Sequence, residues 1–183
     1  MSNLYQLKPN PNSPAEIDIV VEVPKGSSNK YEYDPDLGII RLDRVLYSPM
    51  YYPGDYGFMP GTLADDGDPL DAVVLMEQPT FPGVVVTVRP LGYLEMSDEK
   101  GVDEKLLCVP VHDPRYGGYT TLDDVEPHRL QEIVHFFRTY KDLENKVTQV
   151  GDWRDIDAAH ELIRRCIANH ERTVQGRDKA QAL

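Results

Sequence analysis

The pattern of apolar and polar residues changes its period along the chain, and the first part has the two-residue period of β-strands. Residues 17–23 alternate in this way, which places Glu22 on the side away from the core. Residues 30–33 alternate again, with Lys30 and Glu32 on one face and two tyrosines on the other. A third short strand is predicted at 39–44, after a turn.

A segment rich in aromatic residues, proline and glycine follows at residues 47–61. Proline and glycine at this density favour turns, so irregular structure is predicted there. Apolar runs then predict strands at 72–76, 84–96 and 105–111. The polar stretch 97–103 between the last two predicts the connection of a hairpin.

The last third of the chain has the period of a helix. Apolar residues from Leu130 to Leu143 follow helical spacing behind Pro127, a residue suited to a first helical turn. A second helix with an apolar stripe is predicted from about Asp155 to Ala168.

Strands followed by helices predict an α+β fold, with a small OB-like antiparallel β-barrel of about five strands and flanking helices. The 183 residues, 1–183, are predicted to form a single domain with its core at about 15–168. The polar residues 171–183 are predicted to be a frayed tail.

The formal net charge of −12 argues against binding to nucleic acid or to an anionic membrane surface. An anionic substrate would have to arrive with its own cations or meet a local basic cluster. No stretch approaches the roughly 18 apolar residues of a membrane span, and the N-terminus lacks the features of a signal peptide. The cytoplasm is therefore the expected location.

The two cysteines, Cys108 and Cys166, lie in apolar patterns and have no metal-ligand spacing. Buried free thiols are predicted, which fits a reducing compartment.

The most unusual stretch is residues 65–71, which place four carboxylates in seven positions broken by a glycine and a proline. This composition predicts a loop, and hard divalent cations would relieve the repulsion among its carboxylates. An EF-hand is excluded because, with Asp66 as first ligand, the sixth position is Asp71 instead of glycine. An exposed turn would have the same composition, so this stretch alone does not establish a metal site.

Further charged and phenolic residues recur at the ends of the predicted strands and of the first helix. The candidates are Asp66, Asp68, Asp71, Asp98, Asp103, Glu22, Glu32, Lys30, Arg44, Lys105, Lys141, Tyr52, Tyr56 and Tyr140. Such a set suits a phosphate ester or anhydride bound through several Mg²⁺ ions, with a metal-activated water as nucleophile. Each has a simpler explanation: a solvated strand face, aromatic packing, a polar hairpin tip, or the last turn of a helix.

The order of several short motifs resembles the soluble inorganic pyrophosphatases of the first family, from about Ile17 to Ala168. The most specific motif is Asp66-Gly67-Asp68-Pro69-Leu70-Asp71. The others are Glu22-Val23-Pro24, Lys30-Tyr31-Glu32, Asp43-Arg44, the segment from Tyr52 to Gly57, Asp98 to Asp103 with Lys105, and the segment from His135 to Glu144.

The resemblance implies a distorted five-stranded barrel and Mg²⁺-dependent hydrolysis of pyrophosphate to two orthophosphates. It implies that Asp68 is the general base. The metal ligands would be Asp66, Asp71, Asp98, Asp103, Glu22 and Glu32. The substrate-binding residues would be Lys30, Arg44, Tyr52, Tyr56, Lys105, Tyr140 and Lys141. It also implies several ions per site, Mn²⁺ or Zn²⁺ as substitutes, inhibition by Ca²⁺, and a homo-oligomer, commonly a hexamer.

Three other functions fit parts of the same pattern. A metal-dependent hydrolase of nucleotides or longer polyphosphates would use the same carboxylates. A barrel that binds oligonucleotides through tyrosine and lysine is disfavoured by the net charge. An acidic calcium-binding module would bind Ca²⁺ and release no phosphate.

Overall fold

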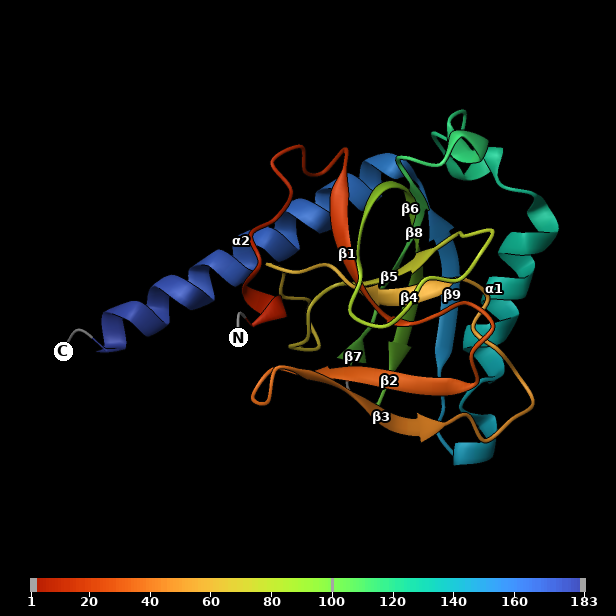
Figure 1. Cartoon of the computed structure of the whole chain (residues 1–183), viewed down its shortest axis with the longest axis horizontal. Coiled ribbons are helices and arrows are strands. Elements are labelled where there is room, and N and C mark those ends of the chain that lie inside the picture. Colours follow the sequence, from red (N-terminus) through yellow and green to blue (C-terminus); the bar gives the residue numbers. More distant parts are fainter. Residues whose placement is uncertain (1–2, 100, 182–183) are drawn as a thin grey trace.

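Five strands of one sheet close into a ring in the computed structural model, which describes residues 3–99 and 101–181 (Figure 1). In ring order they are β1 (Ile17–Val23), β4 (Asp55–Phe58), β5 (Asp71–Val74), β8 (Lys105–Pro110) and β6 (Val85–Asp98). Pairing of β1 with β6 completes the ring. The predicted α+β fold, a five-stranded OB-like barrel with flanking helices, is confirmed.

One pairing in the ring differs from the antiparallel prediction. Strands β5 and β8 run parallel, with Asp71 opposite Lys105. Parallel neighbours need a long crossover. Here the intervening chain supplies it, because β6 lies between β5 and β8 in sequence and pairs with β8.

The remaining strands lie outside the ring. Strands β2 (Asn29–Asp34) and β3 (Ile39–Val45) form a separate hairpin, as the sequence pattern predicted for each strand. The short β7 (Gly101–Val102) and β9 (Gln149–Arg154) pair with β6. The sequence pattern did not predict β9, because its exposed positions interrupt any apolar run.

The prediction of irregular structure throughout 47–61 was wrong, because β4 lies within this segment. Gly57 of β4 passes so close to β1 that an added Cβ would lie 1.9 Å from the backbone oxygen of Val20. Glycine inside a strand often marks such a close backbone approach. Gly57 thus counted against a strand in the sequence, yet its lack of a side chain allows β4 to pair with β1.

Helix α1 (Pro127–Thr139) begins at the predicted proline but ends before Leu143. A separate 3₁₀ turn, η4 (Asp142–Glu144), follows it, and Asn145 stops this turn in the left-handed conformation with φ 56°. Shorter 3₁₀ turns are η1 (Leu4–Gln6), η2 (Pro114–Tyr116) and η3 (Leu122–Asp124).

Helix α2 (Ile156–Gln181) continues well beyond Ala168 and projects from the body of the molecule (Figure 1). The prediction of a frayed tail from residue 171 does not match this helix, and residues 182–183 lie outside the described part. Helical propensity continues through its polar turns. No helix in the described part of the chain combines the length and apolar character needed to cross a membrane.

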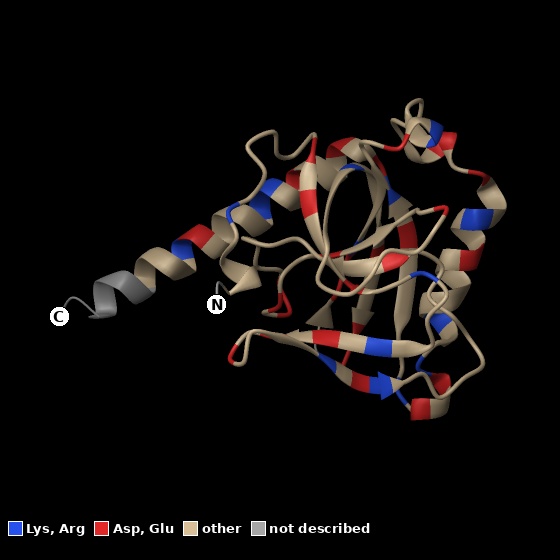
Figure 2. Cartoon of the chain, viewed as in Figure 1, with Lys and Arg blue, Asp and Glu red and all other residues tan. Residues whose placement is uncertain are grey.

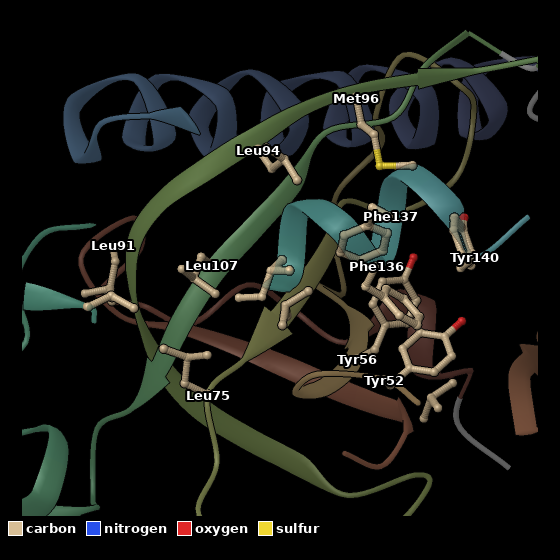
Figure 3. Packing of buried hydrophobic residues seen from close by; sticks show 14 of the residues in the cluster. Tyr52, Tyr56, Leu75, Leu91, Leu94, Met96, Leu107, Phe136, Phe137 and Tyr140 are labelled. Carbon is tan, nitrogen blue, oxygen red and sulfur yellow. The ribbon is translucent and has the colours of Figure 1, made fainter. Parts of the chain in front are cut away.

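Two buried clusters hold the barrel between its helices. One joins the barrel to α1 and is rich in aromatic rings, among them Phe136 and Phe137 (Figure 3). The other packs Ala159, Ile163 and Cys166 of α2 against the opposite side. Burial of one such large side chain stabilises the fold by about 1.5–3 kcal/mol. Both helices are thereby fixed relative to the strand ends.

Candidate active site

All fourteen candidate residues line a single cavity of about 380 Å³. It lies among the ends of the ring strands, the β2–β3 hairpin and the end of α1. Figure 2 shows that β2 and β3 each carry both acidic and basic residues. Residues that are far apart in the sequence therefore converge on one cavity.

The parallel pairing of β5 and β8 forms the centre of this cavity. Asp71 begins β5 and lies opposite Lys105, which begins β8. The Lys105 ammonium donates to the carboxylates of both Asp71 and Asp103. Tyr56 donates its hydroxyl proton to Asp71 at 2.5 Å. The carboxylates of Asp71 and Asp103, which come from separate segments, thus share the buried Lys105 ammonium.

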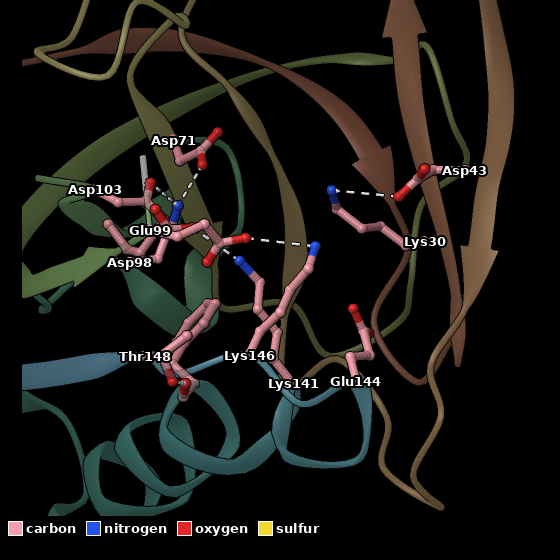
Figure 4. Close-up of polar contacts among 12 residues, drawn as sticks. Lys30, Asp43, Asp71, Asp98, Glu99, Asp103, Lys141, Glu144, Lys146 and Thr148 are labelled. Carbon is pink, nitrogen blue, oxygen red and sulfur yellow. Dashed lines mark hydrogen bonds and ion pairs between the residues drawn. The ribbon is translucent and has the colours of Figure 1, made fainter. Parts of the chain in front are cut away.

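A second ion pair joins the end of β6 to the end of α1. The Lys141 Nζ lies 2.9 Å from Asp98 Oδ2, and both side chains are largely buried (Figure 4). Lys141 directly follows Tyr140, the C-cap of α1. The helix end therefore places this ammonium beside the acidic strand end.

The β2–β3 hairpin provides a more exposed wall of charged groups. The Lys30 ammonium pairs with Glu32 and lies 3.6 Å from Asp43 (Figure 4). Arg44 donates to Asp43 at 2.5 Å and to Glu144 at 2.8 Å. The Arg44–Glu144 ion pair thus joins the hairpin to the segment that follows α1.

Aromatic rings form the floor. The Tyr52 and Tyr56 ring centroids are 5.3 Å apart, and Tyr140 stacks on Phe136 at 5.2 Å. These tyrosines therefore belong both to the core and to the cavity wall. Burial holds the pKa of the Tyr52 and Tyr56 phenols well above the usual value, so both remain hydrogen-bond donors.

The acidic loop turns tightly at the rim. Asp66 Oδ1 accepts a hydrogen bond of 3.0 Å from the backbone N–H of Asp68, and Gly67 between them has φ 92°. This left-handed conformation favours glycine. Asp68 is exposed and lines the cavity, while Asp66 lies deeper.

Glu22 lies on the predicted side of β1, but this side is also buried. The residue is 7% exposed and accepts a 2.7 Å hydrogen bond from the backbone N–H of Tyr33. The strand is enclosed on both faces because the N-terminal segment and the hairpin cover it. Glu22 therefore points away from the apolar core face, as the alternation predicts, and lines the cavity, where it is also buried.

Among the described residues that line the cavity, carboxyl side chains outnumber cationic side chains, nine to five. Burial raises the pKa of Glu22 to about 8 and that of Asp66 to about 6, and it also raises the pKa of Asp103. A hard divalent cation prefers carboxylate oxygens and would displace the protons that these groups retain. The described residues contain no preassembled group of three or more His, Cys, Asp or Glu side chains for a metal ion. The Lys105 ammonium, held between Asp71 and Asp103, marks a position that attracts positive charge.

Several lining residues were not among the candidates. They are Tyr5, Tyr33, Asp43, Phe58, Pro69, Glu99, Phe137 and Lys146. Asp43 could have been predicted from the sequence, because it directly precedes the candidate Arg44. No sequence pattern pointed to Tyr5, since it reaches the cavity from η1 through packing with Tyr33 and Phe58.

Known proteins resemble this chain over most of its length. The family model for inorganic pyrophosphatase matches residues 19–171. The inorganic pyrophosphatase of Synechocystis is 56% identical over 155 residues, which cover 85% of this chain and 92% of that protein. The crystal structure of the Thermus thermophilus inorganic pyrophosphatase superposes with a TM-score of 0.91 at 51% identity, over 93% of this chain and 99% of that one.

A more distant solved structure, the Helicobacter pylori inorganic pyrophosphatase, has a TM-score of 0.86 at 40% identity and covers 90% of this chain and 98% of that one. Both the sequence and the barrel are thus shared over nearly the whole length. The chain therefore belongs to the inorganic pyrophosphatase family and is an enzyme of that family.

Proposed function

We propose that this enzyme hydrolyses pyrophosphate to two orthophosphates with Mg²⁺ as cofactor, by direct attack of water and without a covalent intermediate. The observation that carries the proposal is the pair of carboxylates, Asp71 and Asp103, that converge on Lys105 inside the cavity. No serine or cysteine lines this cavity among the described residues, so no side chain of that kind is available as nucleophile.

The cation ligands in this proposal are side-chain oxygens only. They are Asp66, Asp71, Asp98, Asp103, Glu22 and Glu32. When bound, Mg²⁺ ions supply positive charge to the substrate and lower the pKa of a coordinated water. Mn²⁺ and Zn²⁺ are proposed as substitutes. Ca²⁺ is proposed as an inhibitor because its coordination is larger and less rigid.

Asp68 is the proposed general base. It lies exposed at the cavity wall, where a water can approach it, and the Gly67 turn fixes its backbone. A carboxylate at this place can accept the proton of the attacking water.

The substrate is proposed to bind through the basic and phenolic lining of the cavity. These residues are Lys30, Arg44, Tyr52, Tyr56, Lys105, Tyr140 and Lys141. Guanidinium, ammonium and phenol groups all donate hydrogen bonds to phosphoryl oxygens. Ion pairs and packing hold Lys105, Lys141 and Tyr56 in place before substrate arrives.

Phosphate release from pyrophosphate, tripolyphosphate and ATP, each with and without Mg²⁺, tests the proposal. Release from pyrophosphate that depends on Mg²⁺ and exceeds release from the longer substrates is expected. Release mainly from ATP or tripolyphosphate would favour the nucleotide or polyphosphate hydrolase. Ca²⁺ binding without phosphate release from any substrate would favour the calcium module.

We further propose that the enzyme is a cytoplasmic homo-oligomer, a hexamer by family resemblance, that binds neither nucleic acid nor membranes. Light scattering after size-exclusion chromatography measures the subunit number. Salt-sensitive binding to single-stranded DNA would contradict the proposal and favour the oligonucleotide-binding barrel.

A further inference from the structure

Arg165 of α2 contacts both acidic loops of the cavity from behind. Its Nη2 lies 3.1 Å from Glu104 Oε1 and 3.5 Å from Asp65 Oδ2. Asp65 directly precedes Asp66, and Glu104 directly follows Asp103. One guanidinium therefore joins the immediate neighbours of proposed cation ligands from two different loops.

The contact to Glu104 is the stronger of the two. The Glu104 side chain is 9% exposed, and its second oxygen, Oε2, is buried without a hydrogen-bond partner. A buried carboxylate depends on its counter-ion, since removal of the partner leaves an uncompensated charge. Asp65 is half exposed, so its pair with Arg165 contributes little by itself.

Neighbouring positions of α2 also bind the start of the acidic loop. The backbone N–H of Leu63 donates to the carbonyl of Cys166 at 3.0 Å. The Asn169 side-chain amide donates to the carbonyl of Leu63 at 3.3 Å. Because Cys166 is packed in the core, the helix gives this loop a fixed support.

We propose that Arg165 is a positioning residue, which holds the loop of Asp66 against the segment of Asp103 so that their carboxylates bind divalent cations together. This inference rests on the proposed metal-dependent function. Ligands are oriented by the groups that hold them, and loss of such groups typically costs 10–100-fold in metal affinity.

The sign of the effect separates this role from a simple charge effect. Removal of a positive charge near an acidic site would by itself strengthen cation binding. Loss of alignment between the two loops would weaken it. The matched control is Arg164, the neighbouring exposed arginine, whose side chain forms no ion pair or hydrogen bond with the described residues.

The test compares Arg165→Met, Arg165→Lys and Arg164→Met in the full chain. Calorimetry measures Mg²⁺ binding, and phosphate release measures the Mg²⁺ midpoint and kcat. Arg165→Met should weaken Mg²⁺ binding about tenfold or more, with a much smaller change in kcat at saturating Mg²⁺. Arg165→Lys should recover part of the affinity, because an ammonium keeps the positive charge but not the planar guanidinium that places one Nη2 between the two carboxylates.

Equal or tighter Mg²⁺ binding by Arg165→Met than by Arg164→Met would overturn the positioning role. If Arg165→Met does not fold, as judged by its thermal transition, Arg165→Lys decides, and an affinity equal to the parent's would overturn the role. A parent enzyme that releases no phosphate would refute the proposed function alone. The calorimetric comparison would then still test whether Arg165 aligns a cation site.

Discussion

Lys141 Nζ lies 2.9 Å from Asp98 Oδ2, so a proposed phosphate-binding residue is paired with a proposed cation ligand. The two residues come from the end of α1 and the end of β6. A cation at Asp98 would compete with this pair and free the ammonium for a phosphoryl oxygen. Cation binding and substrate binding are thereby linked through one contact.

The substitution Lys141→Ala should impair substrate handling more than metal binding. Charge-assisted hydrogen bonds contribute about 1.5–3 kcal/mol, so kcat/KM for pyrophosphate should fall roughly 10–100-fold. Mg²⁺ affinity, measured by calorimetry, should change little or increase, because Asp98 loses a competing cation. An unchanged KM and kcat would contradict the phosphate-binding role.

The substitution Asp68→Asn tests the general base. Loss of a proton acceptor at this position should lower kcat by about 10²–10⁴-fold while Mg²⁺ still binds. The neutral Asp65→Asn variant in the same loop serves as control, and its kcat at saturating Mg²⁺ should stay near that of the parent. Near-normal turnover by Asp68→Asn across the pH range would reject Asp68 as base.

Cation binding should release protons at pH 7. Burial raises the pKa of Glu22 to about 8 and that of Asp66 to about 6, so the metal-free site retains protons that a cation displaces. At low pH the carboxyl groups are protonated, and a cation must displace their protons in order to bind. This competition disappears as the pH rises through about 8, the pKa of Glu22. Mg²⁺ affinity should therefore increase from pH 6 to pH 8.

Calorimetric Mg²⁺ titrations in two buffers of different ionisation enthalpy measure this proton release. The Glu22→Gln variant provides the control, because it has no carboxyl proton to lose at that position. A smaller buffer dependence is expected for the variant. Equal heats in both buffers for the parent protein would show that no protons are released.

The candidate residues of the site could be predicted from the sequence because their chemical types can be recognised within short segments. Carboxylates beside glycine and proline in residues 65–71 predict an acidic turn, and the candidate set from the other segments made a cation site the interpretation of that turn. The closure of the ring was harder to predict from the sequence. It depends on pairings such as β1 with β6, which no single segment specifies. Residue type therefore predicted the candidates, and tertiary pairing determined where they meet.

The segments that were predicted wrongly have physical reasons that only the fold shows. Strand β9 has few apolar residues because it lies at the edge of the sheet and pairs with β6 alone. The extended part of α2 projects from the barrel, and its residues 171–176 are exposed, so no apolar stripe is required there. Support of the acidic loop by Arg165 was equally hidden, since a surface arginine on a helix has no distinctive spacing.

The thiols should be unreactive in the folded protein. Cys108 and Cys166 are buried, and burial raises the pKa of the Cys166 thiol to about 12 and that of Cys108 further. The thiolate is the reactive form, so a disulfide-exchange reagent such as DTNB should label neither cysteine. In denaturant the same reagent should label two thiols per chain. Rapid labelling without denaturant would show that the α2 side of the core opens.

Gly57 should be intolerant of any side chain. A Cβ there would lie 1.9 Å from the carbonyl oxygen of Val20, a backbone atom held in the β1–β4 pairing. Gly57→Ala should therefore force β4 away from β1 and destabilise the fold by about 3 kcal/mol or more. Gly118→Ala is the matched control, because an added Cβ there meets nothing within 4 Å. Urea denaturation compares the two variants. A Gly57→Ala protein as stable as Gly118→Ala would mean that β1 and β4 do not approach as closely as the ring requires.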